Sequence, residues 1–192
     1  MINPKRDIRR DLKSKILSLS SNDKEAKQQK IFSLLSPLIH SLTFQGLLSN
    51  EFSVGLFAPL SDEVNCIDFK EWKVISFPSF EKEEMTFKRC SFQELKESTE
   101  FGVNLLCPSN DALDISPDLL IVPGLGFTKN GERLGRGKGF YDRYLANYKG
   151  ITISLVFEEQ LLEALPVEEH DIAVDYVVSE KSVWKQGNAI EL

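Results

Sequence analysis

Residues Asp118 to Leu145 read DLLIVPGLGFTKNGERLGRGKGFYDRYL, and this stretch decides the fold that we expect. Its apolar run, Leu119–Val122, lies between an aspartate and a Pro-Gly pair, which is typical of a strand buried on both faces. A glycine-rich loop with a cluster of basic side chains follows, and Phe140–Tyr148 then continues as a helix. Because glycine lets backbone N–H groups approach a ligand closely, this order of elements predicts an anion-binding site.

The glycine loop matches neither of two common phosphate-binding motifs. The pattern GxxxxGK[ST] would need a glycine at Glu132 and a hydroxyl residue at Gly139. The pattern GxGxxG fails twice, because its third glycine falls on Lys129 or on Phe140. We therefore expect neither a P-loop ATPase nor a dinucleotide-binding fold. A generic glycine turn would leave the basic side chains inside the loop unexplained.

Further from this stretch, strands and helices alternate along the second half of the chain. Strands are predicted at Ile151–Phe157 and Asp175–Ser179, a helix at Glu158–Leu165, and a partly ordered tail from Lys181. The alternation predicts an α/β fold, a three-layer α-β-α sandwich around a mostly parallel, Rossmann-like sheet. The first half is expected to contain a helix from Asn22 towards Leu48 that Pro37 kinks or interrupts, strands Phe52–Ala58, Lys73–Phe77 and Met85–Cys90, a helix Asp62–Trp72, and a long loop Ser98–Pro117.

The chain opens with a predicted amphipathic helix, Lys5–Ser20. Ile8, Leu12 and Ile16 recur at helical spacing and form one apolar stripe. Lys5 and Arg9 lie one turn apart on another face. This basic face is either a solvated surface or, if the helix packs beside the glycine loop, a second source of ligands for the same anion.

The composition indicates one globular domain over residues 1–192, with a net charge of −6 and 42% apolar residues. An acidic chain is a poor candidate for binding nucleic acid or a membrane surface. The three cysteines, Cys66, Cys90 and Cys107, show no CxxC spacing, which argues against a disulfide framework or a zinc site. No signal pattern is visible and no apolar run approaches the ~18 residues of a membrane span. We expect a cytoplasmic monomer.

Four segments resemble one known family. PGLGFTKNGERLGRGKGFYDRYL, residues 123–145, resembles the signature of the 5-formyltetrahydrofolate cyclo-ligase family, also called methenyltetrahydrofolate synthetase. The segments KRDIRRDLK, APLSDEVN and VFEEQLLEALPVEEHDIAVDYVVSE are similar to other parts of that family, in the same order. Together the four cover well over half of the chain.

The resemblance implies an enzyme of folate one-carbon metabolism. Its reaction would be the ATP- and Mg²⁺-dependent cyclisation of 5-formyltetrahydrofolate to 5,10-methenyltetrahydrofolate, with release of ADP and phosphate. Phosphorylation of the formyl oxygen would give an imidate phosphate, and a neighbouring folate nitrogen would then displace phosphate. Such a transfer depends mostly on positioning and on electrostatic stabilisation.

The resemblance also implies site residues. The catalytic roles would belong to Lys138, Arg136 and Glu63, and magnesium would bind at Asp142 and Asp171. The implied ATP-binding residues are Lys5, Arg6, Asp7, Ile8, Arg9, Arg133, Leu134, Gly135, Arg136, Gly137, Lys138, Gly139, Phe140 and Tyr141. The implied folate-binding residues are Arg9, Ala58, Glu63, Arg136, Gly137, Lys138, Gly139 and Phe140.

Several alternatives stay open at this stage. Glu63 could accept hydrogen bonds from the pterin edge or hold the attacking nitrogen, and from residue type alone it could equally belong to a helix start. Thr128, Phe140 and Cys107 depart from the family pattern, which often has an acid, a tyrosine and a glutamate there. A non-catalytic binder of nucleotide or folate and a small-molecule kinase are the competing functions. A pair of carboxylates for a metal favours the ligase.

Overall fold

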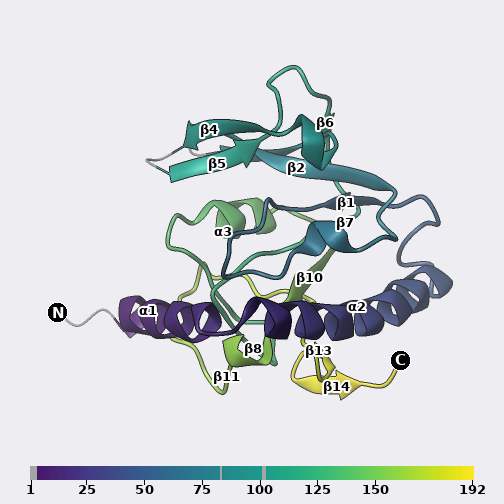
Figure 1. The fold of residues 1–192 in the computed structure, drawn as a ribbon. Coiled ribbons are helices and arrows are strands. Elements are labelled where there is room, and N and C mark those ends of the chain that lie inside the picture. The colour runs from purple at the N-terminus through teal and green to yellow at the C-terminus, as the bar shows by residue number, and fades with distance from the viewer. Residues whose placement is uncertain (1–3, 83, 101–102) are drawn as a thin grey trace.

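The computed structural model describes residues 4–82, 84–100 and 103–192, and it is organised around one large sheet (Figure 1). The strand order in the described part of this sheet is β14-β13-β12-β10-β7-β1-β2-β3-β6. These strands are β1 Ser53–Gly55, β2 Val74–Glu81, β3 Glu84–Arg89, β6 Asp114–Ile115, β7 Leu119–Ile121, β10 Ile151–Leu155, β12 Tyr176–Val178, β13 Val183–Lys185 and β14 Asn188–Ile190.

Smaller elements surround the sheet. A hairpin forms a two-stranded sheet, and a three-stranded sheet has the order β11-β8-β9. The remaining strands are β4 Lys96–Glu100, β5 Val103–Cys107, β8 Gly126–Thr128, β9 Arg133–Leu134 and β11 Leu161–Leu162. The helices are α1 Pro4–Leu17, α2 Ser21–Phe44 and α3 Phe140–Leu145, with 3-10 turns η1 Cys66–Asp68, η2 Phe92–Glu94 and η3 Glu158–Gln160.

The centre of the large sheet is parallel, and both of its edges are antiparallel. Strands β12, β10, β7, β1 and β2 run in the same direction, whereas β13, β14, β3 and β6 add on as antiparallel neighbours. The predicted mixed α/β fold with a mostly parallel centre is confirmed. Because β1 and β7 are adjacent, the loops after their carboxyl ends leave the sheet at the same edge, where ligands bind in open α/β folds.

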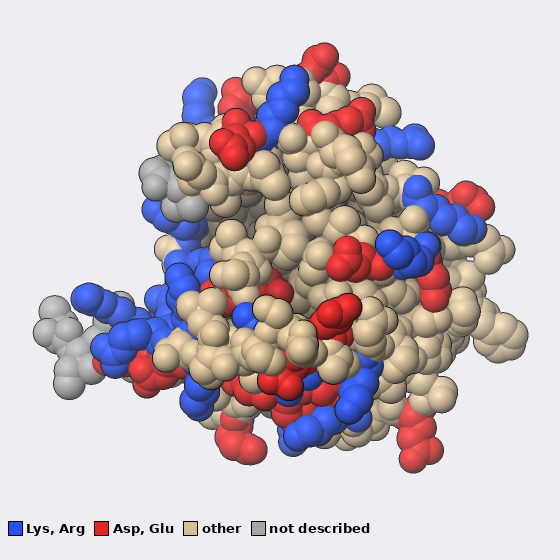
Figure 2. Space-filling model, in the orientation of Figure 1, with Lys and Arg blue, Asp and Glu red and all other residues tan. Residues whose placement is uncertain are grey.

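Helix α1 is fastened to the glycine loop by an apolar contact. Leu12 is 2% exposed and forms a cluster with Leu134 and Leu165. A Cβ atom at Gly126 would lie 2.6 Å from Leu12, so only glycine lets the helix come this close to β8. The predicted apolar stripe is confirmed, and the basic face of α1 is carried to the loop. Figure 2 shows lysine and arginine side chains gathered on this side of the molecule, beside a hollow below the β4–β5 hairpin.

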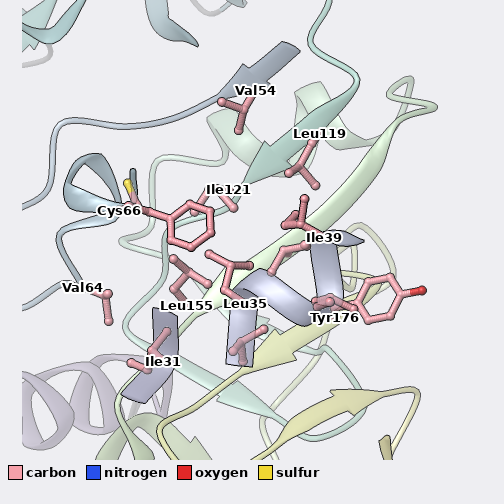
Figure 3. Packing of buried hydrophobic residues seen from close by; sticks show 14 of the residues in the cluster. Ile31, Leu35, Ile39, Val54, Val64, Cys66, Leu119, Ile121, Leu155 and Tyr176 are labelled. Atoms are coloured by element: carbon pink, nitrogen blue, oxygen red, sulfur yellow. The ribbon is translucent and has the colours of Figure 1, made fainter. Parts of the chain in front are cut away.

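Strand β7 is covered on both faces, as its uninterrupted apolar run predicts. Leu119 and Ile121 pack with residues of α2 in one cluster, part of which is visible in Figure 3. Leu120 lies on the other face, in a cluster that α3 joins through Leu145 and Tyr144. The three-layer sandwich stays a prediction. One face of the sheet is covered by α2, with 24 residues, whereas the helix on the other face, α3, has only six. No helix in the described part of the chain has both the length and the apolarity to cross a membrane.

Two predicted helices are wrong because long-range side-chain contacts prevent them. The helix predicted at Asp62–Trp72 is reduced to η1, since the amide oxygen of Gln28 in α2 accepts the N–H of Asn65. The helix predicted at Glu158–Leu165 is reduced to η3 and β11. There the buried Gln160 side chain donates to the carbonyl oxygens of the glycine loop, at 3.0 Å for Gly124.

Two predicted irregular segments, one predicted strand end and the predicted interruption of a helix are also wrong. Residues predicted as the loop Ser98–Pro117 contribute to the β4–β5 hairpin and to β6, and the tail after Lys181 forms β13 and β14. Strand β2 continues past Pro78 to Glu81. Because β1 pairs only with Val74–Ser76, the later part of β2 has no paired strand on that side among the described residues, and it tolerates proline. Helix α2 likewise continues through Pro37 rather than being interrupted there.

Candidate functional site

The glycine loop keeps a backbone conformation that side-chain-bearing residues adopt only rarely. Gly137 has φ 93° and Gly139 has φ 71°, both in the left-handed region. Gly139 immediately precedes α3, and a Cβ atom there would lie 2.8 Å from the Arg143 guanidinium. At these two positions the loop therefore presents main-chain groups, between side chains such as Lys138.

One surface of the loop lines a mostly apolar cavity of about 250 Å³, which we call the aromatic pocket. Its far wall consists of Leu60, Phe80 and Leu105, three residues that sequence reasoning did not select. The full lining is Leu60, Phe80, Leu105, Pro123, Gly124, Arg133, Gly135, Arg136, Gly137, Lys138, Gly139, Phe140, Tyr141 and Asp142. None of the three far-wall residues gave a local signal, because Phe80 lies beyond the predicted end of its strand, Leu60 lies between predicted elements and Leu105 lies in a predicted loop.

The opposite surface of the loop lines a polar cavity of about 410 Å³, which we call the charged pocket. Its lining is Lys5, Arg9, Arg133, Leu134, Gly135, Gly137, Lys138, Gly139, Asp142, Glu168, His170 and Asp171. Six residues line both pockets and form what we call the shared wall, namely Arg133, Gly135, Gly137, Lys138, Gly139 and Asp142. The basic region in Figure 2 includes α1, one side of this pocket.

The charged pocket joins segments that are far apart in the sequence. Arg9 Nε donates to the Gly135 carbonyl oxygen at 2.8 Å, which connects α1 to the loop. Lys5 Nζ lies 2.8 Å from Asp171 Oδ2 and 2.7 Å from Glu168 Oε1. The structure thus brings together the predicted basic residues of α1, the loop and Asp171. Glu168 and His170 were not predicted, although they lie three residues and one residue before Asp171.

The Lys5–Asp171 pair shifts the titration of both groups. Burial by itself raises the pKa of Asp171, but hydrogen bonds from Lys5 and from the Glu168 N–H outweigh it, so this pKa lies below 3.8. Burial likewise lowers the pKa of Lys5, and the bonds to Asp171 and Glu168 outweigh it, so that pKa lies above 10.5. The pair is therefore ionised across the neutral pH range.

The second predicted metal ligand, Asp142, is also neutralised by a base. Its Oδ1 accepts a hydrogen bond from Arg133 Nη2, and the Arg133 side chain is only 4% exposed. Both carboxylates line the charged pocket, which fits Mg²⁺ bound through one or two carboxylates together with phosphate oxygens and water. Among the residues described, no group of three or more His, Cys, Asp or Glu could hold a metal ion by itself.

Arg136 closes one side of the aromatic pocket and binds two acids. Its guanidinium donates to Asp62 at 2.7 and 3.2 Å and to Glu63 Oε1 at 2.8 and 3.1 Å. Glu63 Oε2 accepts the Leu60 N–H at 2.9 Å. The acids are 2% and 5% exposed, and neither lines the pocket, because Arg136 stands in front of them. Glu63 is thus beside the predicted folate site but covered.

Of three other predicted site residues, two line the aromatic pocket and one lines neither pocket. Phe140 packs edge-on against Phe80 with ring centroids 5.0 Å apart, inside the aromatic pocket. Tyr141 lines the same pocket, and its buried hydroxyl has no hydrogen-bond partner in the described chain. Burial raises the pKa of that hydroxyl well above 10. Ala58 is half-buried and lines neither pocket.

Three residues of α1 predicted to bind ATP, Arg6, Asp7 and Ile8, line neither pocket. Asp7 pairs with Arg10, and Ile8 packs onto the Leu12 cluster. Their predicted role is not tested by these contacts. Thr128, the first departure from the family pattern, is buried and donates its hydroxyl to Glu132 at 2.8 Å, away from both pockets.

Lys138 differs from the other basic residues of the two pockets. Its side chain is exposed, and it has no hydrogen-bond or ion-pair partner within the part of the chain that is described. Lys5, Arg133 and Arg136 all hold carboxylates. Lys138 therefore offers an uncompensated positive charge on the shared wall.

Comparison with known proteins gives one family. The sequence profile of the 5-formyltetrahydrofolate cyclo-ligase family matches residues 1–180. The mouse 5-formyltetrahydrofolate cyclo-ligase is 33% identical over 198 aligned positions, covering 93% of this chain and 94% of the mouse protein. The Escherichia coli K12 enzyme of the same name is 44% identical over 85 positions, which cover 41% of this chain and 47% of that protein.

Solved structures show the same fold. The 5,10-methenyltetrahydrofolate synthetase of Aquifex aeolicus superimposes with a TM-score of 0.76 at 26% identity, covering 98% of this chain and 95% of that one. The Mycoplasma pneumoniae 5,10-methenyltetrahydrofolate synthetase superimposes with a TM-score of 0.69 at 22% identity, covering 93% of this chain and 99% of that one. The second likeness bears on the fold alone.

Proposed function

This chain belongs to the 5-formyltetrahydrofolate cyclo-ligase family, and from that premise we propose that it cyclises 5-formyltetrahydrofolate to 5,10-methenyltetrahydrofolate. The reaction consumes ATP and releases ADP and phosphate. The observation that carries the proposal is the shared wall. One glycine loop lines an aromatic pocket suited to a flat folate ring and a charged pocket suited to a triphosphate.

The chemistry needs the two substrates to meet at the shared wall. The formyl oxygen attacks the terminal phosphorus of ATP, and the bond from that phosphorus to ADP breaks. The resulting imidate phosphate carries a good leaving group on the former formyl carbon. The other folate nitrogen bonds to that carbon, loses its proton, and phosphate departs. Both steps require the reacting atoms to be held close together more than they require a nucleophile from the protein.

Lys138 is the residue best placed to stabilise the phosphoryl group during transfer. It lines both pockets, and its ammonium is free of carboxylate partners in the described residues. Arg133 is buried and paired with Asp142, so it contributes a fixed positive charge from behind the wall. Gly135, Gly137 and Gly139 supply main-chain N–H groups without side-chain obstruction. Fixed charges and dipoles of this kind stabilise developing negative charge effectively.

Asp142 and Asp171 would hold Mg²⁺ in the charged pocket. The bound ion would neutralise part of the phosphate charge and orient the triphosphate. In the described structure both carboxylates are paired with bases, Asp142 with Arg133 and Asp171 with Lys5. These bases can turn to phosphate oxygens while the carboxylates turn to the metal. The exchange leaves no buried charge without a partner.

The experiment that tests the proposal mixes protein, MgATP and 5-formyltetrahydrofolate and follows the absorbance of the methenyl product. We expect product only when ATP and Mg²⁺ are both present, so omission of ATP and addition of EDTA are the two controls. A protein that binds both ligands but forms no product at high concentration would be a binding protein, and the proposal would be wrong. We also infer a monomer, since one chain lines both pockets, and gel filtration tests this.

A further inference from the structure

The two acids that hold Arg136 are bonded in different ways. All hydrogen bonds to the Asp62 carboxylate from the described residues come from Arg136, one to each oxygen, at 2.7 and 3.2 Å. Glu63 uses only one oxygen for Arg136, because its other oxygen accepts the Leu60 N–H. Asp62 thus depends on Arg136 for all of its compensation, whereas Glu63 keeps a main-chain donor without it.

This asymmetry determines which bond can break. The Asp62 side chain is 2% exposed, and leaving a buried charge without its partner is strongly unfavourable. Glu63 is almost as buried, at 5% exposed, but its remaining N–H donor and an incoming ligand donor can replace Arg136. Rotation of the guanidinium away from Glu63 while it stays on Asp62 is therefore the least costly way to open this corner of the site.

The folate substrate of the proposed function has the right donors to replace Arg136 at the Glu63 carboxylate. The 2-amino-pyrimidinone edge of a reduced folate presents two adjacent N–H groups, as a guanidinium does, and carboxylates accept such pairs side by side. Arg136 lines the aromatic pocket and covers Glu63, so an incoming ring meets the guanidinium first. The ring can reach the Glu63 carboxylate only by displacing Arg136 from it.

We infer that Asp62 is a positioning residue, which keeps Arg136 in the pocket while Glu63 exchanges the guanidinium for the donor edge of the folate ring. This inference rests on the proposed function and adds to it a residue that acts only through Arg136. After the exchange, the Nε–H and part of the Nη2 group of Arg136 are free on the Lys138 side of the aromatic pocket. Binding of folate thereby adds positive charge where the phosphoryl group is transferred.

The kinetic test compares Asp62→Asn, Glu63→Gln and the combination of each with Arg136→Lys. We expect Glu63→Gln to raise the Kd for 5-formyltetrahydrofolate about tenfold, as loss of a charged hydrogen-bond acceptor does. Asp62→Asn should leave that Kd within about threefold and lower kcat about 100-fold. In the Arg136→Lys background, Asp62→Asn should lower kcat no further, because a lysine cannot make the bidentate pair. Asp118→Asn is the matched control, since its carboxylate accepts two hydrogen bonds from Ser53 at the other end of β7.

A second measurement needs no substitution at Asp62, which protects the test if that variant fails to fold. The Arg136 Nε–H signal can be followed by ¹⁵N NMR in the wild-type protein and assigned by its absence in Arg136→Lys. On saturation with 5-formyltetrahydrofolate we expect the Nε–H signal to shift and to exchange faster with solvent, because its acceptor Glu63 is then bound to the ligand. The Nη–H signals of the groups that Asp62 accepts should stay protected. An unshifted signal means that no exchange occurs at Glu63. Loss of protection at the Nη–H groups that donate to Asp62 means that Arg136 also leaves Asp62. Either result overturns the inference.

Failure of this inference and failure of the proposed function give different results. If the wild type forms product but Asp62→Asn lowers kcat equally in both backgrounds, only the positioning role is wrong. The same holds if Asp62→Asn raises the folate Kd as much as Glu63→Gln does. If the wild type forms no product and the ligand does not shift the Arg136 signal, both are wrong.

Discussion

The aromatic pocket and the charged pocket lie on opposite surfaces of one loop, yet they are built in different ways. The far wall of the aromatic pocket is Leu60, Phe80 and Leu105, whose apolar surfaces need only the right shape. The charged pocket places bases and acids from three distant segments together, and most of them pair with one another. An apolar wall has no charge to compensate, whereas a phosphate site has to be kept balanced until its ligand arrives.

This difference has a practical consequence. A substitution in the aromatic pocket should affect the binding of folate alone. A substitution of a charged residue in the charged pocket should also leave its ion-pair partner without a compensating charge. Residues of the shared wall should affect both substrates or the reaction between them. Substitutions in the shared wall and in each pocket test this division.

Lys138→Ala should have the largest effect, a decrease in kcat of about 100-fold, because it removes the free positive charge from the shared wall. The Kd values for both substrates should change much less, and single-turnover kinetics separates the two effects. Lys149→Ala, an exposed lysine beyond α3, serves as the control. Near-normal turnover of Lys138→Ala would show that this lysine does not contact the phosphoryl group.

Arg9→Ala should lower the affinity for both substrates about tenfold. Arg9 lines the charged pocket, and its hydrogen bond to the Gly135 carbonyl oxygen holds the loop in place. Calorimetric titration with an unreactive ATP analogue and with 5-formyltetrahydrofolate measures the two affinities separately. Lys13→Ala, one turn further along α1 and exposed, should leave both unchanged. If Arg9→Ala alters neither affinity, α1 contributes only to folding.

Phe80→Ala should raise the Kd for 5-formyltetrahydrofolate about fivefold to tenfold, because it removes one aromatic wall and the edge-on contact with Phe140. Affinity for the ATP analogue should stay within twofold. The same titrations measure both values, and Phe44→Ala, a phenylalanine that is 94% exposed, controls for loss of apolar surface. An equal loss for both ligands would contradict the separation of the pockets.

Asp171→Asn should have the smallest effect on the empty protein, a decrease in Tm of about 1–4 °C at pH 7. The pKa of Asp171 is lowered in the folded chain, so its contribution to stability is present above the unfolded pKa and is lost as pH falls through the folded value. The Tm difference from the wild type should therefore shrink between pH 5 and pH 3. Asp11→Asn, on the exposed side of α1, is the control, and a pH-independent difference in Asp171→Asn would contradict the ion pair.

The sequence was informative where a signal is local. The uninterrupted apolar run of β7 predicted burial on both faces, and Leu119 and Leu120 are indeed buried in clusters on opposite faces. The spacing of Ile8, Leu12 and Ile16 predicted the buried stripe of α1. Among the site residues, the basic and glycine positions of the loop do line the two pockets. Their individual roles stay predictions.

Sequence reasoning failed where a segment is shaped by a partner far along the chain. Leu105 was placed in a loop, because the apolar run of β5 is short and lies in a segment that also contains Pro108, Pro117 and several Ser, Asn and Asp residues. Asp62 was read as a residue at a helix start, although its carboxylate binds Arg136 across the fold. No local pattern distinguishes an acid that caps a helix from one that holds an arginine. Only the pairing of β1 with β7 brings these two loops to the same edge of the sheet.

The contact of Lys5 with Glu168 and Asp171 also sets an order of events during synthesis. Chains emerge from the ribosome amino end first, so Lys5 is exported long before the carboxylates that it holds. Every wall of the aromatic pocket has been translated by Asp142, whereas the charged pocket must wait for the segment that contains residue 171. A chain whose translation stalls between these points would carry the complete lining of one pocket and an unbalanced cluster of positive charge at the other.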